Sequence, residues 1–197
     1  MTESVDYYNI HAEEFFNGTN GVDMTEIYRR FLPLIPEGGS ILDAGCGSGR
    51  DAKAFTEMGY RVDAFDASPS LVELANSNNG IQATIDTFDS YSSDEDYDGI
   101  WACASLLHVP FDKLAETIES LSSHLKSSGV FYLSFKLGVG ERDTGQRIFT
   151  DMTLDALTAT ISEASNLNIA KSWITQDLRQ HRNEKWLNAL LMRIVQK

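Results

Sequence analysis

The sequence predicts an α/β fold with a mostly parallel sheet, and three observations support this prediction. Short apolar runs alternate with amphipathic helical stretches from residue 40 to residue 136, a rhythm typical of parallel strands joined by right-handed crossovers. The first apolar run, around Ile41 and Leu42, passes through an acid into a turn with three glycines. The second run ends in another acid, Asp66. Ligands of such sheets bind beyond the carboxyl ends of the strands, so we expect both acids at a binding edge.

The elements can be assigned in order from the hydrophobic pattern. A helix is expected over 6–17 and another over 24–34, with Pro36 beyond its end. Strands are then expected at 40–44, 61–66, 82–86, 98–104 and 129–136, with helices at 50–58, 69–77 and 111–126. Residues 138–147 are polar and predict a surface loop, followed by a helix over 153–165 and strands near 168–176 and 186–195. The last of these also suits a helix.

The glycine turn is the strongest indication of function. Gly45, Gly47 and Gly49 alternate directly after the first strand, and a helical pattern begins after Arg50. A strand that feeds a helix through such a turn brings bare backbone close to a ligand. A purely structural turn is the alternative, because many turns of this type contain glycine.

The acid at the end of the second strand lies 17 residues beyond Gly49. At about this separation in nucleotide-binding folds, an acid accepts hydrogen bonds from a ribose diol. We therefore predict that Asp66 binds a ribose. The alternative is that Asp66 only caps the helix that starts near Ser68 and Pro69.

Three segments carry a resemblance to a known family. Residues 42–49 (LDAGCGSG), 62–66 (VDAFD) and 97–101 (YDGIW) resemble class I S-adenosylmethionine-dependent methyltransferases. Residues 45–50 and 105–110 are similar to small single-domain members, including tellurite-resistance-type enzymes. The nicotinamide alternative is weaker, because its glycines have the wider Gly-x-Gly-x-x-Gly spacing.

The resemblance implies a Rossmann-like, mostly parallel seven-stranded sheet with helices on both faces and the final strand antiparallel. It implies one methyltransferase domain over 1–197, with a helical lid at 1–35, a cofactor-binding half at 38–136 and a substrate-side half at 137–197. The implied cofactor is S-adenosyl-L-methionine. No metal is expected.

Several cofactor contacts follow from the resemblance, with alternatives open at three of them. Asp43 is expected near the ammonium group, or as a hydrogen-bond acceptor for the loop backbone. Arg50 is expected to bind the carboxylate, to brace Asp43, or to remain solvated. Either Asp86 or Asp89 would accept the adenine amino group beside Phe88. The residues expected to bind the cofactor are Asp43, Gly45, Cys46, Gly47, Gly49, Arg50, Asp66, Ala67, Ser68, Asp86, Thr87, Phe88 and Ala104.

The acceptor side is predicted from fewer signals. His108 is a candidate general base with a pKa near neutrality, and a packed structural histidine is the alternative. Tyr7 and Tyr8 would reach the substrate from the lid. Late basic residues would hold an anionic acceptor, or pair as surface charges with Glu141, Asp143, Asp177 and Glu184. These basic residues are Lys136, Arg142, Arg147 and Arg179, together with Arg182.

Charge and composition narrow the class of function. The net charge is −13, with 10 basic and 27 acidic residues in 1–165 but 6 basic and 2 acidic in 166–197. This balance argues against nucleic-acid binding, which needs a basic footprint. No apolar run is long enough to span a bilayer, the first residues carry no secretory signal, and the two cysteines form no disulfide or metal pattern. A reduced cytoplasm is the expected location.

The sequence therefore predicts a methyltransferase that uses S-adenosylmethionine and acts on a small anionic molecule. Two other classes stay open. The chain could methylate RNA or protein through its basic C-terminal third, or bind the cofactor without catalysis. The sequence does not determine the oligomeric state.

Overall fold

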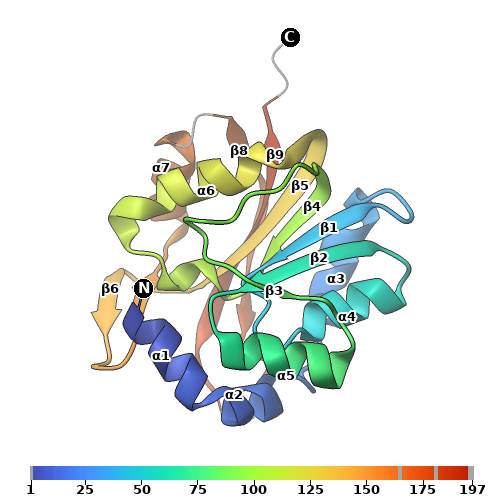
Figure 1. The fold of residues 1–197 in the computed structure, drawn as a ribbon. Coiled ribbons are helices and arrows are strands. Elements are labelled where there is room, and N and C mark those ends of the chain that lie inside the picture. Colours follow the sequence, from blue (N-terminus) through green and yellow to red (C-terminus); the bar gives the residue numbers. More distant parts are fainter. Residues whose placement is uncertain (1, 164–165, 180–181, 195–197) are drawn as a thin grey trace.

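The computed structural model describes residues 2–163, 166–179 and 182–194 and consists of a sheet flanked by helices (Figure 1). The helices are α1 (Thr2–Ile10), α2 (Ala12–Thr19), α3 (Thr25–Phe31), α4 (Arg50–Glu57), α5 (Pro69–Asn79), α6 (Leu114–Ser123) and α7 (Leu154–Glu163), with 3-10 turns at Leu32–Leu34, Leu106–His108 and Phe111–Lys113. The strands are β1 (Ser40–Ala44), β2 (Arg61–Asp66), β3 (Thr84–Ile85), β4 (Tyr97–Ala102), β5 (Leu125–Lys136), β6 (Gly140–Asp143), β7 (Ile148–Asp151), β8 (Leu167–Gln176) and β9 (Lys185–Arg193).

The main sheet has seven strands in the order β3-β2-β1-β4-β5-β9-β8. The pairs among β1 to β5 are parallel, whereas β9 runs antiparallel to both of its neighbours. This topology confirms the predicted Rossmann-like sheet with an antiparallel final strand. It also resolves the ambiguity at the C-terminal end, because Trp186 to Met192 pair with β5 on one side and β8 on the other.

Helices cover both faces of the sheet because successive strand residues point to opposite sides. Leu42, Ile100 and Phe131 pack with α6 and α7 on one face. Their chain neighbours Ile41 and Trp101, with Tyr132 beside them, pack with α3 and Phe55 of α4 on the other face. The central strands are thus buried on both sides, as expected for a parallel sheet.

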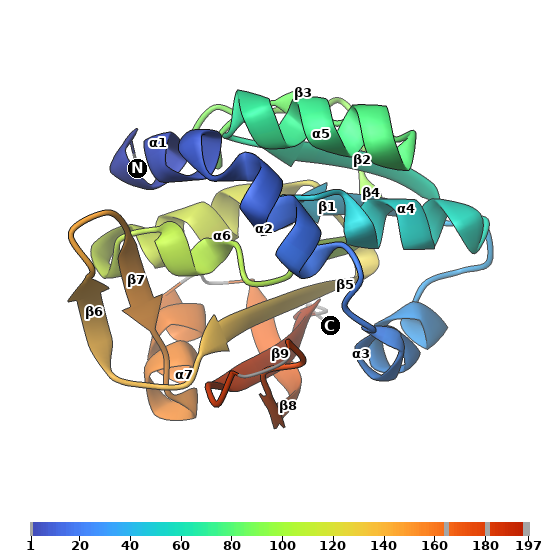
Figure 2. The same ribbon diagram turned by 90° about the horizontal axis from the view of Figure 1, so that it is seen from below.

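The N-terminal segment lies across the edge of the sheet where β1, β2 and β4 end (Figure 2). The single helix expected over 6–17 is in fact two helices, because the chain bends at His11, with φ −106° and ψ 22°. Side chains tie this N-terminal segment to the two ends of α5. Ser68 Oγ donates to Asn9 Oδ1 at 2.7 Å, and Asn79 Nδ2 donates to Asn20 Oδ1 at 2.7 Å.

Residues 138–147 were expected as a loop, but they form half of a β-hairpin. Strand β6 pairs antiparallel with β7, and the turn is closed by a bond from the amide of Thr144 to the carbonyl of Arg147. All of β6 is exposed and polar, so it has no buried alternate positions from which a strand could be predicted. The burial lies on β7, where Phe149 and Thr150 are 5% and 0% exposed.

Other differences concern element boundaries. The third strand is limited to Thr84–Ile85, the helix expected over 111–126 is a 3-10 turn followed by α6, and β5 begins four residues earlier than expected. Of the expected helix over 153–165, residues 164–165 lie outside the described residues. Of the expected strand near 186–195, residue 194 lies beyond β9 and residue 195 lies outside the described residues. None of the helices in the described part of the chain is long and apolar enough to cross a membrane.

Candidate cofactor and acceptor site

A cavity of about 920 Å³ lies at the carboxyl ends of the parallel strands. Its walls come from both ends of the chain, since α1 and α2 line one side and the region from residue 136 to residue 188 lines another. The loops after β1, β2, β3 and β4 supply the remainder. This is the place where open α/β sheets bind ligands.

The glycine turn after β1 has the geometry that the sequence predicted at two of its three glycines. Gly45 and Gly47 line the cavity with φ of +78° and +54°, a region that favours glycine. A Cβ on Gly45 would lie 2.6 Å from Ser105 Cβ, and one on Gly47 would lie 3.1 Å from Phe15 Cε1. The amides of Gly45 and Cys46 both donate to the carbonyl of Phe65 at 2.9 Å. Gly45 and Gly47 thus contribute backbone without a side chain to the cavity wall, while their amides are bonded within the protein.

Gly49 packs against other parts of the protein, and its contact with a cofactor stays a prediction. It is not among the residues that line the cavity. A Cβ at this position would lie 2.6 Å from Ile81 Cδ1 and 3.0 Å from Ala75 Cβ, and φ is +73°. Gly49 therefore allows the start of α4 to pack closely against α5 and the segment after it.

Asp66 lies beside the turn and lines the cavity. Its Oδ2 atom accepts a bond from the amide of Gly47 at 2.8 Å, and its Oδ1 atom accepts one from the amide of Ser68 at 2.9 Å. Burial raises its pKa, although these backbone bonds act in the opposite direction. The cap of α5 is Ser68, whose Oγ accepts the amide of Leu71 at 3.2 Å. The helix-cap interpretation of Asp66 is therefore wrong, and its ribose contact stays a prediction.

Asp43 lies beneath the turn, fully within the protein, and does not line the cavity. The structure therefore does not support a direct contact between Asp43 and a ligand in the cavity. Burial and the neighbouring Asp51 carboxylate raise the pKa of Asp43 well above its usual value, while the charge of Arg50 and the backbone of Ala52 lower it. Its buried Oδ2 atom has no hydrogen-bond partner in the described chain, which leaves it available to a cation or a bridging water.

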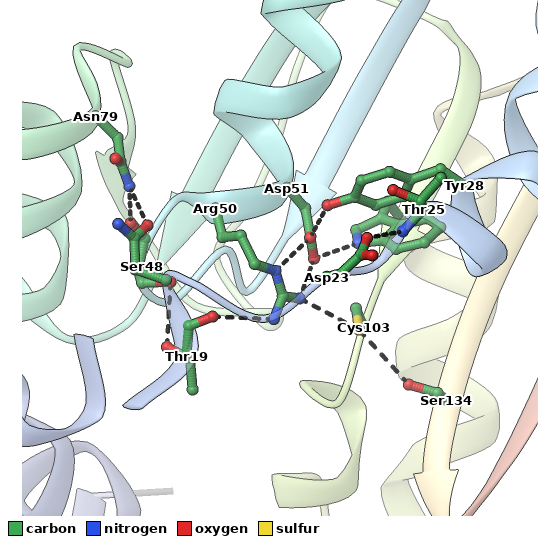
Figure 3. A network of polar contacts seen from close by, with 12 residues as sticks. Thr19, Asp23, Thr25, Tyr28, Ser48, Arg50, Asp51, Asn79, Cys103 and Ser134 are labelled. Carbon is green, nitrogen blue, oxygen red and sulfur yellow. Dashed lines mark hydrogen bonds and ion pairs between the residues drawn. The ribbon is translucent and has the colours of Figure 1, made fainter. Parts of the chain in front are cut away.

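Arg50 lines the cavity and is braced by Asp51, a partner that the sequence analysis missed (Figure 3). Arg50 Nε and Nη2 donate to the two oxygens of Asp51 at 2.7 and 2.8 Å, and Nη1 reaches the carbonyl of Thr19 at 3.4 Å. Tyr28 Oη and Trp101 Nε1 also donate to Asp51. Burial acts to raise the pKa of Asp51, but Arg50 and these bonds lower it below its ordinary value. The sequence signal that could have indicated this ion pair is the adjacent Arg50 and Asp51 at the start of the predicted helix.

The wall near β3 holds the residues expected around adenine. Asp86, Thr87 and Phe88 all line the cavity, whereas Asp89 is exposed and is not part of the lining. Asp86 Oδ1 accepts the amide of Thr87 at 2.8 Å. The Phe88 ring packs edge-on against Phe65 with 5.7 Å between centroids. Of the two candidate acids, the geometry favours Asp86. Cys46, Ala67, Ser68 and Ala104 also line the cavity, as expected.

At the opposite end, His108 and Tyr8 form a hydrogen-bonded pair. His108 Nδ1 lies 3.0 Å from the carbonyl of Ile148, and Nε2 lies 2.9 Å from Tyr8 Oη. Because a carbonyl can only accept, Nδ1 carries the proton and the phenol donates to Nε2. Burial lowers the pKa of His108 to about 4, and the charges of Arg147 and Lys136 add to this effect.

The structure brings the predicted basic residues to this end, but carboxylates neutralise most of them. Arg142 pairs with Asp151, and Arg179 Nε donates to Asp177 at 2.9 Å. Glu184 lies 3.7 Å from Lys136 and 3.9 Å from Arg182. All four cations line the cavity. Asp177 and Glu184, two of the acids named as alternative partners, thus pair with Arg179, Arg182 and Lys136. Arg142 pairs instead with Asp151, and anion binding by these residues stays a prediction.

Arg147 differs from these four cations. Its guanidinium lies 4.0 Å from the centroid of the Tyr7 ring and 5.0 Å from that of Phe149. Nη1 lies 3.5 Å from Tyr8 Oη, and the buried Nε atom has no hydrogen-bond partner within the described residues. Phe149 was not predicted, because it lies on the hairpin strand whose pattern was too short to recognise.

The fold and the glycine-turn site are those of class I S-adenosylmethionine-dependent methyltransferases, and comparisons with known proteins agree. A family model described as a methyltransferase domain matches residues 16–186. The chain therefore belongs to the methyltransferase domain family, whose cofactor is S-adenosylmethionine.

Among curated proteins, a ubiquinone biosynthesis O-methyltransferase of Xanthomonas campestris is 32% identical over 105 residues. The match covers 49% of this chain and 43% of that protein, so the chain spans less than half the length of this relative.

Two solved structures have a similar fold. The 1,6-didemethyltoxoflavin N1-methyltransferase of Burkholderia thailandensis has a TM-score of 0.79 at 19% identity, covering 98% of this chain and 87% of that one. A TehB-like methyltransferase of Corynebacterium glutamicum has a TM-score of 0.70 at 19% identity, covering 96% and 99%. At this identity the likeness concerns the fold alone.

Proposed function

We propose that the protein transfers a methyl group from S-adenosylmethionine to a small anionic molecule. When bound, S-adenosylmethionine supplies a sulfonium methyl group together with its leaving group, so the protein mainly positions the partners and excludes water. The bare backbone at Gly45 and Gly47 and the carboxylates of Asp66 and Asp86 fit such a cofactor. Asp43 and Arg50 would act from beneath and beside the turn.

The observation that carries the anionic acceptor is the state of Arg147. Among the cations that line the cavity in the described chain, it alone has no carboxylate within ion-pairing distance. Its guanidinium is instead held by the ring faces of Tyr7 and Phe149. Such faces orient a guanidinium without neutralising it. Arg147 can therefore bind a carboxylate or another oxyanion in two-point contact.

The shape of the site favours a small acceptor over a polymer. A volume of about 920 Å³ is near the upper end of the range of about 300–1,000 Å³ for small-molecule sites, which allows for a cofactor and a second small molecule. Helices α1 and α2 line the cavity and are bonded through Thr19 and Asn9 to the segments that follow β1 and β2. We propose that residues 1–35 act as a lid. The name of the curated relative points to oxygen as the methylated atom.

The experiment is a screen for S-adenosylhomocysteine release by mass spectrometry. Small carboxylic acids, phosphate esters, oxyanions, neutral amines and tRNA are offered as acceptors. The proposal expects turnover confined to anions, with loss of that turnover in Arg147→Gln. Turnover of tRNA or of neutral amines alone would contradict the anionic acceptor. Failure of S-adenosylmethionine to bind in calorimetry would contradict the methyltransferase assignment itself.

A further inference from the structure

We propose that Tyr8 and His108 form a proton relay, in which Tyr8 Oη receives the proton that the acceptor loses and His108 Nε2 receives the proton of Tyr8. This inference rests on the proposed methyl transfer at the same cavity. It replaces the expectation that His108 acts directly on the acceptor, because the Tyr8 hydroxyl already occupies the free nitrogen at 2.9 Å.

The imidazole is held in the tautomer that a relay needs. The Ile148 carbonyl, at the start of β7, lies 3.0 Å from Nδ1 and fixes the proton on that nitrogen. The Nε2 lone pair is consequently directed at the phenol. A backbone acceptor that orients one nitrogen so that the other can take a proton is the arrangement that histidine bases use. The Phe149 ring at 5.0 Å keeps the imidazole in place.

Aromatic contacts also fix the phenol ring of Tyr8. The Tyr8 ring makes edge contacts with Tyr7 at 5.5 Å, Phe15 at 5.0 Å and His108 at 5.3 Å. Its hydroxyl donates its single proton to Nε2, so the oxygen keeps acceptor capacity. Arg147 Nη1, at 3.5 Å, is its other partner. Tyr8 lines the cavity, so an acceptor hydroxyl or amine can donate to the same oxygen.

The charges around the pair make the relay depend on an anionic acceptor. Arg147 and Lys136 face the imidazole, and Asp66, Arg147 and Tyr7 act on the phenol. Burial is the largest cause of the low pKa of His108, about 4, and the two cations contribute to it. Glu184 already lies 3.7 Å from Lys136. Arg147 is the cation that remains unpaired, and an anion bound to it would offset its charge. The imidazole of His108 therefore becomes a stronger base when an anionic acceptor binds.

The proton and charge balance closes without a further reactant. The acceptor heteroatom forms a bond to the methyl group, and the bond between that methyl group and sulfur breaks. The heteroatom's proton moves to Tyr8 Oη while the phenolic proton moves to His108 Nε2. The positive charge that the sulfonium loses is therefore carried, after the transfer, by the His108 imidazolium. That imidazolium returns its proton through Tyr8 to solvent when the product leaves.

The first test is imidazole ¹⁵N NMR on the full chain with S-adenosylhomocysteine bound. The signals of His108 are assigned by comparison with His108→Gln, and His124→Gln serves as the control from outside the cavity. We expect a protonated Nδ1 and a bare Nε2 at pH 7. We also expect the Nε2 resonance to shift in Tyr8→Phe but not in Tyr60→Phe. A proton on Nε2 at pH 7, or an Nε2 signal indifferent to Tyr8→Phe, overturns the relay.

The second test uses the acceptor found in the screen. Loss of a proton-transfer group typically lowers the rate about 10²- to 10⁴-fold. We expect this fall in kcat for Tyr8→Phe, with a much smaller change in the acceptor KM and with cofactor affinity unchanged. The kcat of the parent falls at acid pH as His108 is protonated, and His108→Gln removes this acid limb. An unchanged kcat in Tyr8→Phe contradicts the relay. Cofactor binding by calorimetry stays intact in that case, so the proposed function and the relay fail separately.

Discussion

The two ends of the cavity are built in different ways. At the proposed cofactor end, formed by the glycine turn and Asp66, the Gly45 and Gly47 backbone and the Asp66 carboxylate are fixed by bonds between neighbouring strand ends. At the acceptor end, Tyr8 and Arg147 are separated by 139 residues in the chain, and they meet through side-chain contacts alone. The first end depends on backbone geometry, and the second depends on how distant segments pack together.

This difference separates cofactor binding from acceptor choice. Changes in the glycine turn alter backbone that several strands share, whereas changes around Arg147 alter a few side chains on the hairpin and the lid. We therefore expect substitutions at the two ends to have separable effects on the two ligands.

The largest expected effect is on cofactor binding in Gly47→Val. The added side chain meets Phe15 at a backbone position with φ +54°, and it occupies space that the cofactor needs. We expect S-adenosylmethionine affinity to fall more than about 1,000-fold, or ~4 kcal/mol. Gly59→Val, at φ +92° with nothing within 4 Å, is the control for backbone strain. Equal calorimetric affinities for the parent and a folded Gly47→Val would show that the turn does not bind the cofactor.

The buried brace beside the turn should control stability. Asp51→Ala leaves Arg50, Tyr28 Oη and Trp101 Nε1 without their acceptor, and breaking a buried ion pair costs about 3–5 kcal/mol. Urea denaturation should show this loss. Glu26→Ala, which removes an exposed pair with Arg29, should cost about 0–1 kcal/mol. Similar losses for the two variants would mean that the Asp51 network contributes little.

Arg147→Gln should weaken the acceptor without affecting the cofactor. Removing one partner of a partly desolvated charge pair costs about 2–5 kcal/mol, seen as a higher KM for the anionic acceptor. Arg182→Gln is the matched control, because Arg182 is 56% exposed and is paired with Glu184; it should cost about 0–1 kcal/mol. Should both variants behave alike, Arg147 has no special part in anion binding.

Asp66→Ala should weaken cofactor binding without affecting the acceptor. A charged hydrogen bond to the ribose contributes about 1.5–3 kcal/mol, so S-adenosylmethionine should bind more weakly by that amount while the acceptor KM changes little. Asp89→Ala, on the exposed loop nearby, is the control. An unchanged dissociation constant would restrict Asp66 to holding the amides of Gly47 and Ser68.

The smallest expected effect is on the pH dependence of stability. The pKa of His108 is about 4 in the folded protein, against an ordinary value of 6.5. As pH falls from 6.5 towards 4, the unfolded chain takes up a proton that the folded chain does not, so the parent loses stability. The shift sets an upper limit of about 3–4 kcal/mol on this loss, which His108→Gln should remove. If the free energy of unfolding, measured by urea denaturation, falls equally at acid pH in the parent and in His108→Gln, His108 is not held neutral in the folded protein.

Sequence reasoning located the glycine-turn end of the cavity because the signals for this end are local. The strand, the acid and the glycines lie within a few residues, and backbone sterics dictate what such a turn must do. Asp51 was missed because its partners Tyr28 and Trp101 come from α3 and β4. Gly49 was expected at the cofactor from the glycine spacing and the family resemblance, whereas its packing against Ile81 and Ala75 depends on residues distant in the sequence.

At the other end of the cavity, the sequence offered Asp177 and Glu184 as alternative ion-pair partners, but it did not indicate the Arg142–Asp151 pair or the unpaired state of Arg147. Five basic residues were expected to act together, and the structure pairs Arg142 with Asp151 and Arg179 with Asp177. Which cation stays unpaired depends on the β6–β7 hairpin, which places Arg147 against Tyr7 and Phe149. That packing joins segments far apart in the chain, and no local pattern encodes it.

A crystal structure with S-adenosylhomocysteine tests both ends of the cavity in one measurement. The account predicts the ribose at Asp66, the amino-acid part over the Gly45–Gly47 backbone, and the thioether sulfur directed towards Tyr8 and Arg147. An adenosine bound elsewhere, or a sulfur directed away from Arg147, would contradict the assignment of these two ends.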